Sequence, residues 1–289
     1  LKLQDWLDKQ RDKDLTFKTK IWGTSPDSID KAEDREQFES ILRKLSIRQP
    51  LNGIARTKIE ALTIANRIKY PVVVRPSYVL GGRAMEVVFD EKELNTYMTE
   101  AVKIDPSHPV LIDQYLQNAV EVDVDALCDR NNQVLIGGIM EHIEPAGIHS
   151  GDSACCLPTI TLSESSLSVV KDWTKKLSIA LDVNGLINLQ FAVQNNNEPE
   201  EKVYIIEANP RASRTVPFVS KATGVQLAAL ATRLMAGETL ESTGYTIEPV
   251  PPLQAIKEAV LPFKRFPGSD SVLGPEMRST GEVMGSAST

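Results

Sequence analysis

The chain contains the stretch Val203-Tyr-Ile-Ile-Glu-Ala-Asn-Pro-Arg-Ala-Ser-Arg214, in which a short apolar run leads into a dense group of polar side chains. Residues 203–206 predict a buried strand. Because alternate residues of a strand share a face, Glu207 and Asn209 should lie on the same side of the sheet. Both carry oxygen, the ligand atom that Mg²⁺ prefers. The end of this strand is therefore a candidate metal site.

Two guanidinium groups follow the strand immediately. Pro210 cannot donate to a ladder of hydrogen bonds, so the strand should end there. Arg211 and Arg214 come next, and planar guanidinium forks bind carboxylates and phosphates well. We expect a metal–nucleotide site with an anionic substrate beside it.

Residues 185–193 predict the strand that precedes this one, and residues 195–202 predict the hairpin tip between them. Gln190 lies between Leu189 and Phe191. Alternation of faces along the strand is enough to explain a polar residue between two apolar ones. The alternative is that Gln190 is a third oxygen ligand of the metal.

An earlier pair of strands surrounds two glycines. Residues 72–75 predict a strand that ends at Arg75, and residues 84–89 predict the returning strand. Gly81 and Gly82 lie in the turn between them. A glycine pair lets backbone amides approach phosphate oxygens, although a plain hairpin turn and a solvated arginine explain the same pattern.

Residues 121–128 alternate strictly between acidic or polar and apolar side chains. Glu121, Asp123 and Asp125 should share one face, which a half-exposed strand with its acids in water would explain. The alternative is that Glu121, at the start of the strand, binds a ribose hydroxyl.

A polar loop, Gly147-Ile-His-Ser-Gly-Asp-Ser153, contains one of the three histidines of the chain. A histidine in a loop is often incidental, but its small and polar neighbours favour a loop that covers a ligand. Cys155 and Cys156 follow, and we expect them to be buried and unreactive.

Composition narrows the function further. A net charge of −7 argues against a general nucleic-acid binder, and no apolar run approaches the roughly 18 residues that span a membrane. The adjacent Cys155 and Cys156 cannot form an ordinary disulfide with each other, which favours a reducing compartment such as the cytoplasm. The chain begins without Met and ends in mid-pattern, so we expect a piece of a longer protein.

Periodicity and caps predict the remaining elements. We expect helices over residues 1–10, 26–45, 57–69, 91–103, 163–181 and 217–236, further strands over 20–23, 109–115, 133–141 and 255–261, and a linker over 285–289. Arg35 should lie on the charged side of the second helix, paired with Glu33 or Glu39. Many strands are joined as hairpins, which predicts an α+β fold with antiparallel sheets.

Ordered motifs over residues 21–285 resemble an ATP-grasp domain, and more closely the C-terminal synthetase half of carbamoyl-phosphate synthase large subunits. The motifs are Gly23-Thr-Ser-Pro-Asp27, Ala32-Glu-Asp-Arg35, Val74-Arg-Pro-Ser-Tyr-Val-Leu-Gly-Gly-Arg-Ala-Met-Glu86, Glu121-Val-Asp-Val-Asp-Ala126, Gly147-Ile-His-Ser-Gly-Asp-Ser153, Asn188-Leu-Gln-Phe-Ala192, Glu207-Ala-Asn-Pro-Arg-Ala-Ser-Arg-Thr215 and Gly274-Pro-Glu-Met-Arg-Ser-Thr-Gly-Glu-Val-Met284. In that family the first half phosphorylates bicarbonate and the second phosphorylates carbamate, and residues 75–84 resemble the second half.

The resemblance implies an ATP-grasp fold in which two α+β subdomains with antiparallel sheets clasp the nucleotide. It implies five segments: 1–23, a remnant of a preceding domain; 24–56, a helical connector; 57–116, the small subdomain; 117–240, the large subdomain; and 241–289, a C-terminal segment and linker. Against that family, residues 1–23 would be only a remnant of the preceding domain, with an unusually charged insertion.

The resemblance also implies roles for single residues. Nucleotide contacts would come from Arg75, Gly81, Gly82, Gln114, Leu116, Glu121, Gly147, Ile148, His149, Ser150, Gln190 and Glu207. The metal ligands would be Gln190, Glu207 and Asn209. Arg211 and Arg214 would hold carbamate and the transferring phosphoryl group, with Arg35 assisting.

The implied cofactors are ATP and Mg²⁺ or Mn²⁺, with K⁺ as a further ion. The implied partners are the rest of the large subunit and a glutaminase small subunit, and neither nucleic acid nor membrane is expected. The product would feed arginine or pyrimidine synthesis. Two alternatives stay open: another ATP-grasp ligase that joins a carboxylate to an amine, and a nucleotide-binding module that is inactive without its missing parts.

Overall fold

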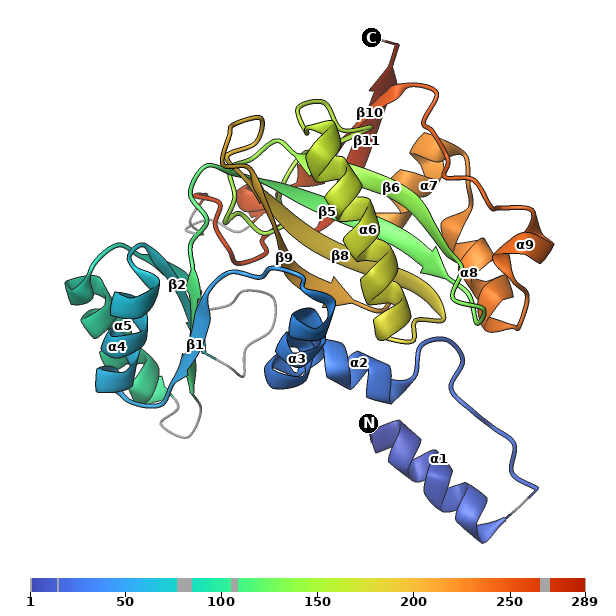
Figure 1. Ribbon diagram of the computed structural model, residues 1–289, viewed down its shortest axis with the longest axis horizontal. Coiled ribbons are helices and arrows are strands. Elements are labelled where there is room, and N and C mark those ends of the chain that lie inside the picture. The colour runs from blue at the N-terminus through green and yellow to red at the C-terminus, as the bar shows by residue number, and fades with distance from the viewer. Residues whose placement is uncertain (1, 15, 77–84, 105–108, 266–270, 289) are drawn as a thin grey trace.

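The computed structural model describes residues 2–14, 16–76, 85–104, 109–265 and 271–288, with the side chains of residues 100–104 left out. Two antiparallel sheets organise the chain, a smaller one at the left of Figure 1 and a larger one at the right. Gly81, Gly82 and most of the predicted turn around them lie outside the described residues.

The small sheet has four strands in the order β1-β4-β2-β3. They are β1 (Asn52–Ala55), β4 (Val110–Gln114), β2 (Val72–Pro76) and β3 (Glu86–Val88). Two helices, α4 (Lys58–Ile68) and α5 (Glu91–Ile104), cover one face, as Figure 1 shows. Their apolar side chains and alternate strand residues such as Val72 and Val74 form one core.

The large sheet has seven strands in the order β11-β10-β7-β6-β5-β8-β9. In chain order they are β5 (Ala119–Cys128), β6 (Val134–His142), β7 (Cys155–Leu157), β8 (Gly185–Gln194), β9 (Lys202–Asn209), β10 (Gln254–Val260) and β11 (Gly281–Ala287). All described pairings are antiparallel, which confirms the predicted α+β class.

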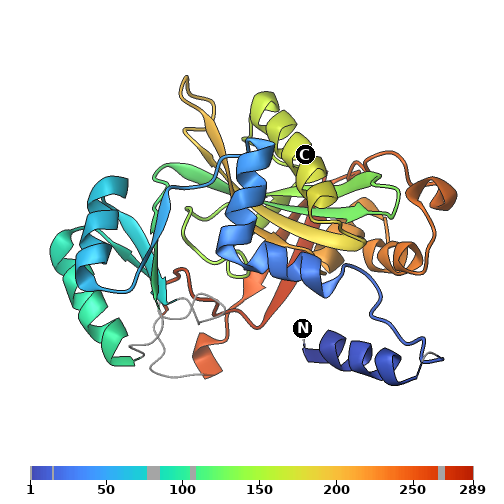
Figure 2. The same cartoon turned by 60° about the horizontal axis from the view of Figure 1, so that its bottom comes forward.

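Helices cover both faces of the large sheet. One face packs against α6 (Glu164–Ala180), α2 (Pro26–Glu33) and α3 (Arg35–Leu45). The other packs against α7 (Val216–Thr223), α8 (Leu227–Met235) and α9 (Leu240–Thr243). In Figures 1 and 2, α2 and α3 lie in the middle of the molecule, and α1 (Lys2–Lys13) lies at its edge.

Local chemistry explains where several helices begin and end. The Ser25 hydroxyl caps α2 by accepting a hydrogen bond from the Ser28 amide at 3.1 Å, with Pro26 at the first position, as predicted. The single helix predicted over residues 26–45 is wrong, because Asp34 ends α2 and caps α3. The helix predicted over 217–236 likewise divides at Gly224, whose φ of +77° suits a residue without a side chain.

Other expectations also need correction. Residues 20–23 form no strand. Strands β1 and β7 form where no strand was predicted. The linker expected over residues 285–289 is wrong for 285–287, which belong to β11 and pair with β10. Cys155 and Cys156 are buried, as predicted, and burial raises the pKa of Cys156 to about 11, so its thiol stays protonated near neutral pH.

Candidate active site

Three polar side chains form a row across the central strands of the large sheet. In the antiparallel register, Asp123 on β5 lies opposite Gln190 on β8, and Gln190 lies opposite Glu207 on β9. Neighbouring residues on each strand belong to the core beneath α6, so this row lies on the opposite face, which we call the site face. The predicted ligands Gln190 and Glu207 are therefore brought together by register.

A second row lies one step along the same strands. Asp125 lies opposite Asn188, and Asn188 lies opposite Asn209. Asp123 and Asp125 are only 2% and 1% exposed, so the simple explanation of a half-exposed strand with its acids in water is wrong. Residues that follow β9, including Ser213 and Thr215, cover this part of the face. The periodicity of the sequence does not show that they pack there.

The predicted nucleotide loop, residues 147–153, contacts both predicted binding strands. The Gly147 amide donates to Glu121 Oε1 at 2.9 Å, and Gln190 Nε2 donates to Ser150 Oγ at 2.8 Å. Gly147 has a φ of +99°, and a Cβ there would lie 3.0 Å from the ring of Tyr115. Only glycine allows this backbone to pass the aromatic ring without strain.

His149 lies inside this loop, with its backbone amide donating to the Gly274 carbonyl at 2.8 Å. Burial lowers the pKa of His149, while the carboxylates of Asp152 and Glu207 oppose that effect and Arg214 adds to it. Three predicted site residues from different segments, His149, Glu207 and Arg214, thus lie within electrostatic range of one another.

The loop is attached to the C-terminal part of the chain by residues that the sequence did not single out. Asp152 is buried and accepts hydrogen bonds from the amides of Arg278 and Ser279, each at 2.8 Å. Lys257 on β10 is 0% exposed, and its Nζ lies 3.3 Å from the Ser150 carbonyl and 3.4 Å from Glu282 Oε1. Because Lys257 is buried and donates to the backbone of the loop, it attaches the loop to β10. A lysine in a strand pattern does not predict this role.

His142 is a further residue that the sequence patterns did not predict. It is buried, with Nε2 3.1 Å from Asp123 Oδ2 and Nδ1 3.5 Å from Glu121 Oε2. Burial lowers the pKa of His142, but Cys155 and Asp123 raise it by more, so the pKa lies well above its usual value. Burial raises the pKa of Glu121, and His142 and the Gly147 amide partly offset this. Glu121 therefore lies beside the loop, and its predicted role in binding a ribose stays a prediction.

Asp113, on β4 of the small sheet, forms ion pairs with two arginines. Asp113 pairs with Arg35 at the start of α3, and its Oδ2 lies 3.9 Å from Arg75 Nε on β2. The prediction that Arg35 pairs with Glu33 or Glu39 is wrong. Burial, and repulsion from Arg75, lower the pKa of Arg35 to about 10. Burial also lowers the pKa of Arg75, and attraction to Glu207 opposes it, so Arg75 lies within electrostatic range of the predicted metal ligands.

Arg211 and Arg214 extend from the turn after β9. Both are exposed. Arg211 Nη2 donates to Asn209 Oδ1 at 3.2 Å, and Arg214 Nη1 donates to Ser279 Oγ at 3.3 Å. Arg214 Nη1 also lies 2.6 Å from Met277 Sδ. Both side chains are exposed, so their guanidinium groups are accessible to an anion.

The predicted hinge residues lie between the two sheets along the chain. Gln114 exchanges hydrogen bonds with Leu51, and its neighbour Tyr115 donates its hydroxyl to the Ala146 carbonyl at 3.0 Å. Leu116 is buried in a small apolar cluster with Ala119, Ala192 and Tyr204, against which Ala146 packs. Ile148 is partly buried in the loop. An apolar cluster at this position is compatible with the predicted binding of a nucleotide base nearby.

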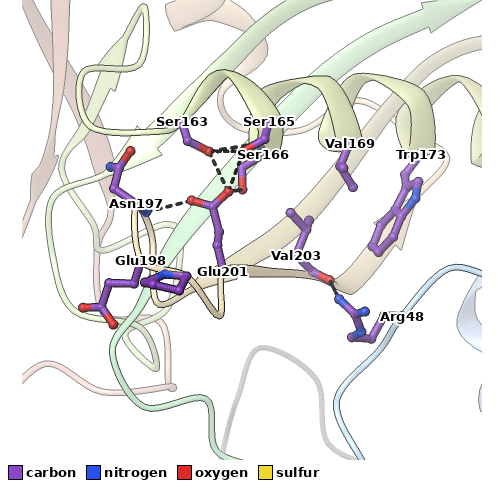
Figure 3. Close-up of a pocket in the computed structure, with 11 residues that line it drawn as sticks. Arg48, Ser163, Ser165, Ser166, Val169, Trp173, Asn197, Glu198, Glu201 and Val203 are labelled. Carbon is purple, nitrogen blue, oxygen red and sulfur yellow. Dashed lines mark hydrogen bonds between the residues drawn. The ribbon is translucent and has the colours of Figure 1, made fainter.

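A separate pocket of about 570 Å³ lies at the start of α6, outside this set of residues (Figure 3). Its Glu201 accepts hydrogen bonds from the hydroxyls of Ser163, Ser165 and Ser166. Burial raises the pKa of Glu201, but the hydrogen bonds outweigh it and lower the pKa to about 2. The pocket contains none of the predicted site residues, and its Glu201 carboxylate is already satisfied by the start of α6 and by the Asn197 amide of the β8–β9 hairpin. We therefore take the site face as the candidate active site.

The donor set fits a magnesium ion that arrives with a nucleotide. In the described part of the chain, no three His, Cys, Asp or Glu side chains group in a way that could hold a metal. Glu207 supplies one carboxylate, and Gln190 uses its amide nitrogen on Ser150, which leaves its carbonyl oxygen as a ligand. Asn209 would have to share its oxygen with Arg211. Mg²⁺ takes few protein ligands where phosphates and water complete its shell.

Comparison with solved structures identifies the fold. The chain is similar to a biotin carboxylase from Campylobacter jejuni (TM-score 0.70, 19% identity, 83% of this chain and 53% of that one). It is also similar to the biotin carboxylase domain of a Hydrogenobacter thermophilus 2-oxoglutarate carboxylase (TM-score 0.72, 20% identity, 92% and 64%). The fold is therefore the ATP-grasp fold.

A family model described as "Carbamoyl-phosphate synthase L chain, ATP binding domain" matches residues 34–243, and the chain belongs to that family. It is 65% identical over 267 residues to the carbamoyl phosphate synthase large chain of a Nostoc species, covering 92% of this chain and 24% of the relative. It is 60% identical over 266 residues to the arginine-specific chloroplastic large chain of Oryza sativa, covering 92% and 22%. The chain spans about a quarter of the length of the curated relatives that it matches.

Proposed function

We propose that this chain is the carbamate-phosphorylating part of a carbamoyl-phosphate synthase large subunit, which transfers the γ-phosphoryl group of ATP to carbamate. The observation that carries the proposal is the row Gln190–Glu207 with Arg75, His149 and Arg214 in electrostatic range. Oxygen ligands and cations of this kind suit a reaction in which several negative charges meet.

The chemistry asks little covalent work of the protein. A carbamate oxygen attacks the γ-phosphorus, the bond to the ADP oxygen breaks, and carbamoyl phosphate and ADP result. Carbamate already carries its nucleophilic oxygen, so no general base is needed. Bound Mg²⁺ neutralises phosphate charge, and the protein's own residues position the two anions.

Each side chain has a proposed role in that positioning. Arg75 holds nucleotide phosphate, Glu121 holds ribose, and the hinge at Gln114 and Leu116 holds the base. Arg211 and Arg214 hold carbamate and the moving phosphoryl group. The loop that contains His149 covers the site, which protects carbamate from water.

We extend the proposal to three finer points. Mn²⁺ can take the place of Mg²⁺, because oxygen ligands suit both divalent ions. K⁺ is a further ion. The chain works with the rest of its large subunit and with a glutaminase small subunit that supplies ammonia. It is cytoplasmic, which its three buried free thiols support. None of the helices in the described part of the chain combines the length and apolar character needed to cross a bilayer.

The test is the reverse reaction in the full-length large subunit that contains this chain. ADP, Mg²⁺ and carbamoyl phosphate are supplied, and formation of ATP is followed. We expect ATP to form. Absence of ATP from the intact subunit would exclude the proposed function and leave a nucleotide-binding module. Activity with a different carboxylate and amine would favour another ATP-grasp ligase.

A further inference from the structure

The turn that carries Arg211 and Arg214 is attached to the sheet through a side chain of another strand. This turn, residues 210–215, is called the arginine turn below. The Ser213 hydroxyl donates to Asp125 Oδ1 at 2.7 Å, and the Thr215 hydroxyl donates to Asp125 Oδ2 at 2.6 Å. The two hydroxyls also lie 2.8 Å apart.

Asp125 itself has a fixed position. It lies on β5, which pairs with β6 on one side and β8 on the other. Asn188 on β8 donates to Asp125 Oδ1 at 3.0 Å, and the aspartate is only 1% exposed. The arginine turn is therefore tied to the middle of the large sheet.

Asp125 also fixes the direction in which the Ser213 and Thr215 hydroxyls donate. Both Asp125 oxygens accept, so an ionised Asp125 requires each hydroxyl to donate toward it. The donors are neutral, and a buried carboxylate without a cation is costly to keep. An apolar side chain of similar size would leave the hydroxyls of Ser213 and Thr215 without this acceptor, so the carboxylate is what connects the turn to β5.

The two arginine side chains are exposed and have few contacts of their own. Arg211 donates to Asn209 Oδ1 at 3.2 Å, and Arg214 Nη1 lies 3.3 Å from Ser279 Oγ and 2.6 Å from Met277 Sδ. The backbone of the turn sets where each side chain begins, so the tether contributes to the position of both guanidinium groups. An error of about 1 Å in such groups can lower a rate about a hundredfold.

We propose that Asp125 is a positioning residue that holds the arginine turn through Ser213 and Thr215, so that Arg211 and Arg214 contact the anionic substrate together. This inference rests on the proposed function for the identity of the substrate, while the tether itself can be measured without it.

The experiment uses the full-length large subunit with Ser213→Ala, Thr215→Val or Asp125→Asn, and measures ATP formation from ADP, Mg²⁺ and carbamoyl phosphate. Thr174→Val is the matched control, since Thr174 is buried on α6 across the sheet and its hydroxyl has no hydrogen-bond partner. In each hydroxyl variant we expect the KM for carbamoyl phosphate to rise about five- to tenfold, as for a lost hydrogen bond, and the KM for ADP to stay within twofold.

An unchanged KM for carbamoyl phosphate in both hydroxyl variants overturns the inference, and so does an equal rise in both KM values, which would indicate general loosening. If Asp125→Asn fails to fold, the hydroxyl variants still decide. If the unaltered subunit forms no ATP, the proposed function fails and the inference is tested separately. Amide hydrogen exchange in residues 211–216 then measures whether Ser213 and Thr215 hold the arginine turn. Exchange at least tenfold faster in Ser213→Ala than in Thr174→Val supports it, and equal exchange overturns it.

Discussion

Gln190 on β8 and Glu207 on β9 lie directly opposite each other, and a register shift follows at once between Gln190 and Phe191. The pair therefore lies where the ladder becomes irregular, at the end of β9 that leads into the arginine turn. Irregular pairing of this kind is common beside active sites, where it directs side chains out of the sheet.

Changing Glu207 to Gln should weaken magnesium binding at this pair, because the oxygen ligand stays but its charge is lost. We expect ATP formation to need at least about tenfold more Mg²⁺, with the maximal rate about 100-fold lower. A magnesium titration of the reverse reaction measures both. Glu198→Gln, an exposed glutamate of the β8–β9 hairpin, is the control. An unchanged magnesium dependence in Glu207→Gln would remove Glu207 from the metal site.

Gly147→Ala should separate a local effect on the nucleotide from a general effect on stability. Its φ is +99°, and the added Cβ would lie 3.0 Å from Tyr115, beside the hydrogen bond to Glu121. Gly244 has a φ of +80° with open space around it, so Gly244→Ala carries the backbone strain alone. We expect Gly244→Ala to lose about 1 kcal/mol of stability, Gly147→Ala to lose somewhat more, and only Gly147→Ala to raise the KM for ADP. Equal KM values in the two variants would contradict the role of this loop.

Asp113→Ala should destabilise the chain, because it leaves Arg35 and Arg75 without their shared carboxylate. Arg35 and Asp113 are 22% and 23% exposed, so we expect a loss of about 1–2 kcal/mol, below that of a fully buried pair. Chemical denaturation measures it. Glu39→Ala breaks the exposed pair with Arg43 and should cost under about 0.5 kcal/mol. Similar losses in the two variants would show that the Asp113 contacts add nothing.

Asp125 should make stability depend on pH between about 4 and 6. Burial raises its pKa from 3.8 to about 6, and hydrogen bonds from Thr215, Ser213 and Asn188 oppose this. The folded state holds the Asp125 proton more tightly than the unfolded state does. The contribution of Asp125 to the free energy of unfolding is therefore fully present below pH 4, and about 3 kcal/mol of it is lost as pH rises through 6. Asp125→Asn should lack this loss, which denaturation at several pH values shows. Parallel pH profiles of the two proteins would contradict the raised pKa.

Short-range patterns predicted the strand that carries Glu207 and the cap at Ser25, because alternation and capping are local properties. The same alternation predicts Glu207 and Asn209 as candidate oxygen ligands on one face. Alternation also placed Asp123 and Asp125 on one face, but it did not show what covers that face. Their burial depends on Thr215 and on the segments that follow, 90 residues away from Asp125 in the case of this threonine.

Other features depend on contacts that no local pattern carries. The partner of Arg35 is Asp113, 78 residues away, while Glu33 and Glu39 were the nearby choices. Lys257 is a charged residue in a strand, and only the Ser150 carbonyl and Glu282 explain its burial. Strand β11 contains glycine, serine and alanine, which favour a linker by propensity, and pairing with β10 overrides that preference.

The most direct measurement compares two reactions of the full-length large subunit that carries Glu207→Ala or Arg214→Ala in this chain. One is ATP formation from ADP, Mg²⁺ and carbamoyl phosphate. The other is bicarbonate-dependent ATP hydrolysis, which the resemblance to the family implies for the other half. We predict that ATP formation falls at least 100-fold while bicarbonate-dependent hydrolysis keeps at least half its rate. Loss of the hydrolysis with normal ATP formation would contradict assignment of carbamate phosphorylation to this chain.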